Sequence, residues 1–345
     1  MKKIQLIQLG VGNVGKALIG QITRGENGIK KRFNIDICYY GLFNSKGGIF
    51  SDNGLSNQEI RNFPAKMNAE IKNVINKVNS SFILLDLTAS DATFPFLYHA
   101  LQKGASVVLA NKRPLAGPYT QYKLLHSFKP NQILHETTVG AGLPVIRTLK
   151  TLLATGDEII SITGCFSGTL GFICSSIEEG KSFSESVRIA RKIGYTEFDP
   201  REDLSGNDVA RKVIILARMI GQKIEMKDIQ IKKLYPPEYE KFTVDEFMTH
   251  IVRLDSLYIE KFKKAKKKNK VLRFVADISK KNCTIGLREV EKENDIGTLT
   301  GPDNIVIFTT KYYLSQPLVI KGPGAGPFVT ASGVFGDILT IGGVL

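Results

Sequence analysis

The sequence predicts an α/β protein with two domains, the first built on a doubly wound parallel sheet and the second, of α+β type, on an open mixed sheet. Short apolar runs alternate with helical patterns from residue 1 to about residue 140, and such alternation is typical of a parallel sheet covered by helices. After Gly142 the helical patterns become longer. The length of 345 residues also suits two hydrophobic cores better than one.

The first domain is predicted over residues 1–141. Its strands are expected in IQLIQL, IDICYYGLF, FILLDLT, SVVLA and QILHET, and its helices in GKALIGQI, TFPFLYHALQKG and YTQYKLLHSF. The second domain is predicted over residues 142–315, with strands in EIISITGCF, VLRFVADISK and CTIGLREVE. The remaining segment, 316–345, is glycine-rich and then helical, and we expect it to return to the first domain.

The composition limits the classes of protein that can be considered. The hydrophobic fraction is 43%, and no apolar run approaches the roughly 18 residues that a membrane-spanning helix needs. The start MKKIQLIQLGVG runs into a glycine pattern instead of a cleavage site, which favours a first strand over a signal peptide. Four cysteines lack metal or disulfide spacing, which favours a reducing cytoplasm; they are Cys38, Cys165, Cys174 and Cys283.

The net charge of +14 has its densest cluster in KFKKAKKKNK, residues 261–270. Such a cluster can bind a phosphate backbone. It lacks the interleaved aromatic residues of a single-strand binder and any helix-turn-helix or zinc signature. We therefore expect a solvated helix end and loop there, with no nucleic-acid or membrane partner.

A phosphate-binding motif follows the first strand. In LGVGNVG, Gly10, Gly12 and Gly15 stand in the GxGxxG register, with Asn13 and Val14 between them. The first glycine permits a tight turn, the second lets the backbone approach a pyrophosphate, and the third allows close helix packing. The motif predicts a dinucleotide site in a Rossmann domain, against the alternative of a plain glycine turn.

The tip of the second strand bears on which dinucleotide binds. A carboxylate there would accept the ribose hydroxyls of NAD, but the strand ends in Asn44, Ser45 and Lys46, and Asp36 lies too early. A polar and basic tip tolerates a 2′-phosphate, with Lys46 as the charge partner. NADP(H) is therefore favoured, and use of NAD(H) remains open.

Two later strand ends indicate the nicotinamide neighbourhood. Ligands of open α/β sheets bind beyond the carboxyl ends of the strands. The segment LDLTAS places Thr88 and Ala89 there, and LANKRPLAG places Asn111 and Lys112 there. The alternative for Lys112 is the start of a surface loop.

The stretch DLSGNDVARK, residues 203–212, opens a helix with Asp208 and Lys212 four residues apart. Taken alone, this pair is most simply an exposed ion pair, contributing roughly 0.2–0.5 kcal/mol to the helix.

Six motifs in order give the chain a resemblance to the homoserine dehydrogenase family: GVGNVG, LANKRPLAG, HETTVGAGLP, FSGTLGFI, GYTEFDPREDLSGNDVARKV and GPGAGPFVTASGV. The resemblance implies reversible NAD(P)H-dependent reduction of L-aspartate 4-semialdehyde to L-homoserine, a step of threonine, methionine and isoleucine biosynthesis, by a cytoplasmic homodimer. It further implies that Lys212 donates the proton and that Lys112 is a second lysine at the carbonyl. Glu197 and Asp208 would bind the amino-acid substrate, and Asp203 belongs to the same acidic cluster.

The resemblance also implies a monovalent cation, sodium, held by the Glu136 carboxylate and by the main-chain oxygens of Val139, Ala141 and Leu143. Oxygen ligands suit a hard cation. The alternative for this glycine-rich turn is a hinge between domains, since Gly140 and Gly142 permit unusual backbone angles. In the last motif the resemblance places Gly324 and Gly326 near the cofactor.

Two further expectations concern departures from the family. Many members carry a regulatory domain or a fused aspartate kinase, and we expect this chain to be a short form with neither. Cys165 stands at a usually apolar position, and we expect it to be buried rather than nucleophilic. The rival functions are an aldehyde-oxidising semialdehyde dehydrogenase, which needs a catalytic cysteine, and a non-catalytic protein that binds a dinucleotide or nucleic acid.

Overall fold

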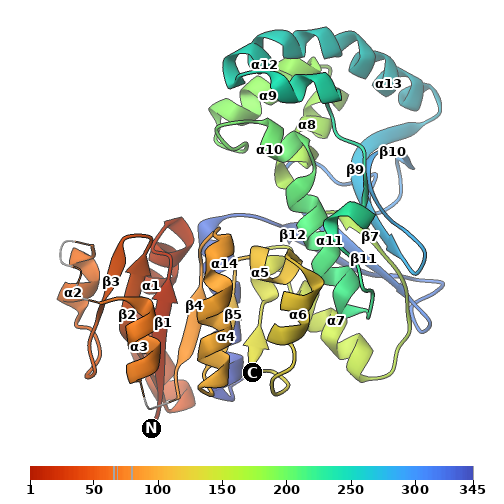
Figure 1. The fold of residues 1–345 in the computed structure, drawn as a ribbon. Coiled ribbons are helices and arrows are strands. Elements are labelled where there is room, and N and C mark those ends of the chain that lie inside the picture. Colours follow the sequence, from red (N-terminus) through yellow and green to blue (C-terminus); the bar gives the residue numbers. More distant parts are fainter. Residues whose placement is uncertain (65–66, 68, 79–80, 345) are drawn as a thin grey trace. The chain divides into compact units, whose positions relative to one another are not determined.

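The structure is a computed structural model that describes residues 1–64, 67, 69–78 and 81–344. The chain forms two compact units, one of Met1–Pro144 together with Ala325–Leu345 and the other of Val145–Gly324. Figure 1 colours the chain along its sequence, so the first unit carries both the red N-terminal elements and the blue C-terminal helix. The sequence predicts the returning segment from residue 316, whereas residues 318–323 form an edge strand of the second unit.

The first unit contains a six-stranded sheet in the order β3-β2-β1-β4-β5-β6. The strands are β1 (Lys2–Leu9), β2 (Ile35–Asn44), β3 (Gly47–Phe50), β4 (Ile83–Asp86), β5 (Ser106–Leu109) and β6 (Ile133–Leu134). All neighbours pair in parallel except β2 and β3, which form an antiparallel hairpin. The predicted doubly wound sheet is confirmed. The sequence did not indicate β3, because its run GGIF is too short to show a period.

Helices cover this sheet: α1 (Asn13–Phe33), α2 (Asn57–Asn62), α3 (Ile71–Lys77), α4 (Phe94–Gln102), α5 (Arg113–Ala116), α6 (Tyr119–Leu125) and α14 (Pro327–Gly342), with 3-10 turns η1 (Asp91–Thr93) and η2 (Glu136–Thr138). Helices α1 and α14 pack side by side. Leu18 of α1 and Val334 and Ile338 of α14 share one hydrophobic core with Leu6 of β1. The last helix of the chain thus completes the core of the first unit.

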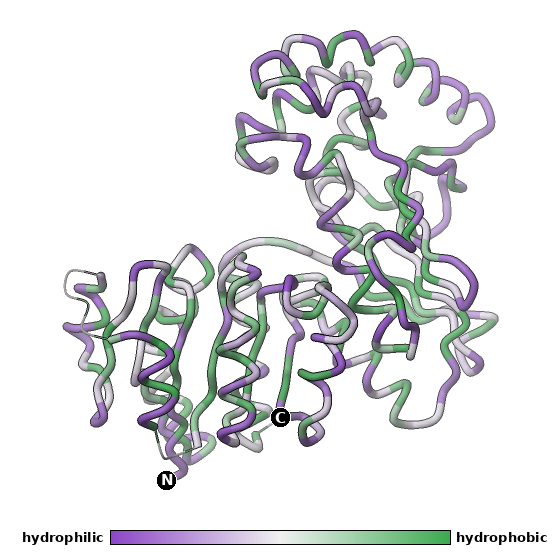
Figure 2. Tube along the Cα trace, viewed as in Figure 1, coloured by the Kyte–Doolittle hydropathy of each residue, from purple (hydrophilic) through white to green (hydrophobic). Residues whose placement is uncertain are grey.

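The second unit contains another six-stranded sheet, in the order β12-β11-β7-β9-β10-β8. The strands are β7 (Ile159–Cys165), β8 (Gln230–Ile231), β9 (Lys270–Ser279), β10 (Cys283–Glu291), β11 (Asp303–Thr310) and β12 (Leu318–Pro323). Only the β8–β10 pair is parallel, so the predicted open mixed sheet is confirmed. Figure 2 shows hydrophobic residues along the inner strands of both units.

The helices of the second unit are α7 (Val145–Ala154), α8 (Gly168–Glu178), α9 (Phe183–Lys192), α10 (Arg201–Leu204), α11 (Asn207–Met219), α12 (Val244–His250) and α13 (Asp255–Lys267), with 3-10 turns η3 (Met226–Asp228), η4 (Pro237–Lys241) and η5 (Ile251–Leu254). Helices α8, α11 and α13 pack against β9. No helix in the described part of the chain is long and apolar enough to cross a membrane.

The lysine cluster at residues 261–270 occupies the end of α13 and the turn into β9. Several of its ammonium groups pair with carboxylates: Lys264 with Glu260 at 2.6 Å, and Lys268 with Glu289 at 2.9 Å. Figure 2 colours much of α13 as hydrophilic. These pairs neutralise part of the positive charge, as a solvated helix end would.

Candidate active site

The glycine loop joins β1 to the start of α1. Gly10 has φ +92°, and a Cβ at Gly15 would lie 2.4 Å from the Gly10 carbonyl oxygen. Gly12, in contrast, faces open space, with no atom within 4 Å of a Cβ built there. The first turn of α1 contains no acidic residue, and its N–H groups have no partners within the helix. The loop therefore offers an anion site of the kind that a dinucleotide pyrophosphate occupies.

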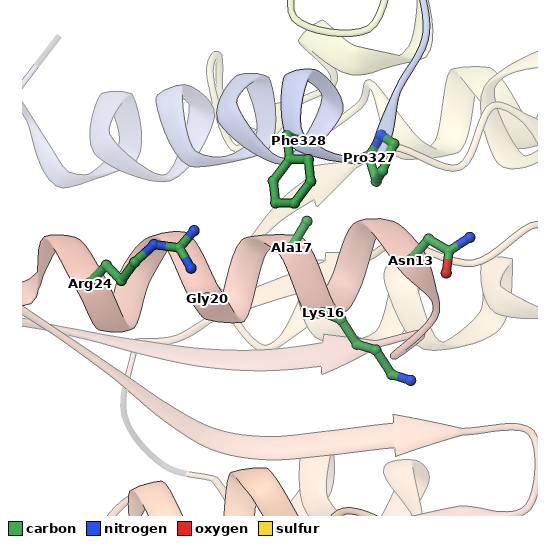
Figure 3. A pocket seen from close by; sticks show the side chains of 7 residues that line it. All are labelled: Asn13, Lys16, Ala17, Gly20, Arg24, Pro327 and Phe328. Carbon is green, nitrogen blue, oxygen red and sulfur yellow. The ribbon is translucent and has the colours of Figure 1, made fainter.

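A shallow hollow of about 320 Å³ lies beside this loop, between α1 and α14. Figure 3 shows Phe328 over Ala17, with Asn13 at one end of the hollow. Lys16 and Arg24 add positive charge to its lining. The hollow extends the basic surface of α1 away from the glycine loop.

The tip of β2 is the turn that leads into β3. The Asn44 carboxamide oxygen accepts the Lys46 backbone N–H at 2.8 Å, and the Lys46 side chain is exposed. Asp36 lies at the other end of β2, where its carboxylate pairs with Lys30 at 2.8 Å. The hydrogen bond from Lys30 lowers the pKa of Asp36. The turn thus presents an ammonium group and no carboxylate.

A buried carboxylate connects the ends of β4 and β5. Asp86 is fully buried, and it accepts hydrogen bonds from the Thr88 hydroxyl at 2.7 Å and from the Asn111 amide at 3.0 Å. Asn111 also donates to the Ser90 carbonyl at 2.7 Å. Lys112 follows directly, as the residue that caps the short helix α5. This network fixes the backbone on which Thr88, Ala89 and Lys112 are carried.

The segment from Glu136 to Leu143 is a tight buried turn. Gly140 has φ +80° and Ala141 has φ +52°, so two consecutive residues of this turn are in the left-handed region. The Glu136 side chain is only 6% exposed, and the Glu136 backbone N–H donates to the Asp337 carboxylate of α14 at 2.9 Å. One buried carboxylate and the carbonyl groups of a tight turn are a donor set that fits a hard cation.

Lys212 lies on α11 with 8% of its surface exposed. Its ammonium group donates to the Phe166 carbonyl oxygen at 2.6 Å and pairs with the Asp208 carboxylate at 2.8 Å. Phe166 follows the last residue of β7. The pair is therefore not the fully exposed one that spacing alone suggested, because the lysine is enclosed and only the aspartate reaches the surface.

Asp208, the partner of Lys212, is one of three acidic residues whose charges interact. The Asp203 carboxylate accepts the Glu197 backbone N–H at 3.0 Å. Burial, together with the charges of Glu197 and Asp208, raises the pKa of Asp203 to about 6. The structure thus brings Glu197, Asp203, Asp208 and Lys212 together, as an arrangement able to hold an ammonium group beside a proton donor.

Gly324 has a structural reason to be glycine. A Cβ there would lie 1.9 Å from the side-chain amide of Asn304 on β11. Asn304 is 1% exposed, and its amide nitrogen and oxygen have no hydrogen-bond partner within the described residues. Gly326, with φ +123°, meets nothing within 4 Å, so of the two glycines it leaves more space for a ligand.

The cysteines lack the character of nucleophiles. Burial raises the pKa of the Cys165 thiol to about 12 and the pKa values of Cys174 and Cys283 to about 11. A thiol with so high a pKa stays protonated near neutrality and reacts slowly. This argues against an aldehyde-oxidising reaction through a catalytic cysteine.

The sequence analysis did not identify Asp86 and Asp337. Asp86 accepts hydrogen bonds from Thr88 and Asn111, and Asp337 accepts one from the Glu136 backbone N–H. Asp86 carried a usable signal, because it is a lone acid at the end of the apolar run FILLD. Asp337 carried none that could be read locally, because its partner Glu136 is 201 residues away. Among the described residues, no group of three or more histidine, cysteine or acidic side chains is placed to hold a metal ion.

Comparisons with known proteins identify the family. The family model described as "Homoserine dehydrogenase" matches residues 144–339, and the one described as "Homoserine dehydrogenase, NAD binding domain" matches residues 10–133. A bifunctional aspartokinase/homoserine dehydrogenase from Zea mays is 38% identical over 350 residues, covering 98% of this chain and 38% of the relative. The chain thus spans well under half of the length of that curated relative.

Two other proteins are similar over most of their own length. A homoserine dehydrogenase from Schizosaccharomyces pombe is 42% identical over 271 residues, covering 75% of this chain and 72% of the relative. A hyperthermophilic archaeal homoserine dehydrogenase solved in complex with NADPH has a TM-score of 0.74 and 26% identity, covering 98% of this chain and 97% of the other.

Proposed function

The chain belongs to the homoserine dehydrogenase family of NAD(P)-dependent oxidoreductases, and from this premise we propose that it reversibly reduces L-aspartate 4-semialdehyde to L-homoserine. The observation that carries the proposal is the enclosed Lys212 ammonium group paired with Asp208, whose charge, with that of Glu197, also acts on Asp203. Reduction of an aldehyde leaves an alkoxide that needs a proton, and an amino-acid substrate carries an ammonium group that needs carboxylates. One cluster offers both.

Lys212 is the proposed proton donor. When bound, the reduced nicotinamide supplies the hydride. The Lys212 ammonium, fixed by the Phe166 carbonyl and the Asp208 carboxylate, polarises the substrate oxygen and then protonates it. In the reverse direction the neutral amine accepts the hydroxyl proton. Lys112, at the start of α5, is the proposed second lysine at the carbonyl.

Glu197 and Asp208 are the proposed partners of the substrate ammonium group. Charge-assisted hydrogen bonds of this kind are short and directional. The Asp203 carboxylate accepts the Glu197 backbone N–H, so it helps to position Glu197 for its contact with the substrate ammonium group. A substrate without the α-ammonium group should therefore bind poorly.

The cofactor is proposed to be NADP(H) in preference to NAD(H), bound through the glycine loop. The exposed Lys46 and the lack of a carboxylate in the turn from Asn44 to Gly47 support this choice. Asn13, Val14, Asn44, Thr88, Ala89, Gly324 and Gly326 complete the proposed set of cofactor-binding residues. Discrimination by Lys46 would act on the 2′-phosphate alone.

Sodium is the proposed cation at Glu136, Val139, Ala141 and Leu143. The buried Glu136 carboxylate and the two left-handed residues of the turn support this proposal. A monovalent ion there would stabilise the turn that precedes Pro144, where the first stretch of the first unit ends. It would take no part in proton transfer.

We further propose a homodimer in a reducing compartment such as the cytoplasm. One face of the second sheet is half exposed and carries Thr163, Ile307 and Val319 as neighbours across three strands, which is a surface that a second copy could cover. The four cysteines are free thiols, as a reducing compartment would keep them. Light scattering of the purified chain tests the dimer.

The test of the function is a spectrophotometric assay of the purified chain. We expect L-homoserine to reduce NADP, and L-aspartate 4-semialdehyde to oxidise NADPH. Oxidation of the semialdehyde in the presence of phosphate would instead support the rival dehydrogenase, and no turnover with intact cofactor binding would support a non-catalytic protein.

A further inference from the structure

Gln8 is a polar residue on an apolar face of β1. Side chains alternate along a strand, so Gln8 follows Ile4 and Leu6, which belong to the hydrophobic core shared with Leu18 of α1. Gln8 itself is 0% exposed. An amide buried where an apolar side chain would fit costs free energy unless it forms a hydrogen bond. The bond that Gln8 forms therefore indicates why it is there.

The Gln8 side-chain nitrogen donates to the Gly10 carbonyl oxygen at 2.9 Å. Only the NH₂ end of the amide can face a carbonyl group, so the chemistry fixes the orientation of the amide. Gln8 Oε1 has no hydrogen-bond partner in the described part of the chain. A Cβ at Gly15 would lie 2.6 Å from Gln8 Nε2, so the glycine at 15 also makes room for this amide.

This bond determines which way one peptide of the glycine loop faces. The peptide between Gly10 and Val11 precedes no proline, and such peptides are trans in nearly all cases. In a trans peptide the C=O and N–H point in opposite directions. Because the Gly10 oxygen points inward at buried Gln8, the Val11 N–H points to the opposite side of the peptide, away from Gln8. A flipped peptide would present an oxygen on that side instead of a donor.

We propose that Gln8 is a positioning residue for the cofactor: its amide holds the Gly10–Val11 peptide in the orientation that directs the Val11 N–H at the pyrophosphate. This rests on the proposed function, because it requires a dinucleotide at the glycine loop. Gln8 touches neither the cofactor nor the substrate. It acts through the loop backbone, so its effect is confined to ligands that carry the pyrophosphate.

The test compares Gln8→Met with Gln21→Met. Methionine keeps the length of the side chain and removes the donor. Gln21 is a matched control, because its side-chain nitrogen also donates to a carbonyl oxygen, that of Phe328 at 2.9 Å, and its Oε1 is likewise buried and unpartnered. The dissociation constants of NADPH, ADP-ribose and adenosine are measured by titration, together with KM for homoserine and kcat.

We expect Gln8→Met to weaken NADPH and ADP-ribose by about tenfold, the factor that corresponds to one hydrogen bond. Adenosine affinity, homoserine KM and kcat should change less than twofold, and Gln21→Met should bind NADPH like the parent chain. A second variant, Gln8→Glu, should bind NADPH more weakly still where the glutamate is ionised, because its oxygen repels the Gly10 oxygen.

Three outcomes would overturn the inference: unchanged NADPH binding in Gln8→Met, equal losses for adenosine and ADP-ribose, or equal losses in the two methionine variants. Each would make Gln8 a packing residue without a directional role. If the parent chain itself failed to bind NADPH, the proposed function would fail instead, and the comparison of variants would not be reached.

Discussion

Lys212 is buried, whereas Asp208, its ion-pair partner at 2.8 Å, is 44% exposed at its side chain. The lysine therefore has a fixed place between the Phe166 carbonyl and a carboxylate that a substrate can reach. A surface pair such as Lys264 with Glu260, at 2.6 Å, has the same spacing, but both of its side chains are more than 60% exposed. The two pairs therefore differ in burial, and the enclosed one is the pair that we propose to act on the substrate.

Lys212→Ala should lower kcat by about 10²–10⁴, the usual contribution of a general acid–base group. The NADPH dissociation constant should stay within twofold, which shows that the fold is intact. The melting temperature should fall modestly, because the Phe166 carbonyl loses its donor. Lys264→Ala is the control and should keep full activity, since exposed pairs contribute little. Full activity in Lys212→Ala would make Lys112 the leading proton donor.

Asp203 predicts a pH dependence of stability. Its pKa is raised from 3.8 to about 6, first by burial, so the folded chain binds this proton more tightly than the unfolded chain does. The folded state is therefore favoured at low pH, and this contribution is lost as pH rises from about 4 to about 6. Asp203→Asn removes the titration. The melting temperature of the variant minus that of the parent should increase across this window, and a constant difference would contradict the assignment.

Lys46→Ala should raise KM for NADP(H) severalfold and leave KM for NAD(H) nearly unchanged. The ammonium group can contact the 2′-phosphate, which NAD(H) lacks, so NAD(H) serves as the internal control. The loss should shrink at high salt, because exposed charges are screened. Initial rates with both cofactors give the answer, and equal changes in the two KM values would remove Lys46 from the phosphate site.

Glu136→Gln should abolish activation by sodium. A neutral amide keeps the shape of the side chain but removes the charge that balances a cation. The measurement is the rate with sodium chloride against choline chloride at equal ionic strength, in the parent chain and in the variant. If the parent chain responded to neither salt, sodium would be excluded, and the buried turn would be explained by its contact with Asp337 alone.

The sequence predicted the fold where a local pattern repeats. The spacing of apolar residues was enough to predict strands β1, β2, β7, β9 and β10. The order of the motifs was enough to identify the family. Strands β3, β8, β11 and β12 were not predicted. Unlike the equally short β4 and β6, β3 and β8 are not part of a longer apolar run in the sequence.

The candidate site was predictable to the extent that its residues are neighbours in sequence. Asp208 and Lys212 share one helix face, so four-residue spacing was enough to associate them. The burial of Lys212 was not predictable, because it depends on the Phe166 carbonyl, 46 residues away. Asn304 and Gly324 show the same limit: the sequence predicts Gly324 as a cofactor contact, and it could not show that a Cβ there would also collide with the Asn304 side chain.

The packing of α14 against α1 has a consequence for synthesis on the ribosome. Ala331, Val334 and Ile338 are part of the core that contains Leu6 and Leu18, yet the ribosome adds them only after residues 145–324 have been made. Residues 1–144 therefore leave the ribosome before the helix that completes their hydrophobic core. They cannot finish folding until Val145–Gly324, a unit with a continuous chain, has been made. During that interval the first unit exposes the apolar surface that α14 later covers. Completion of its core requires closure of a long loop, so we expect chaperones to bind the first unit during this interval.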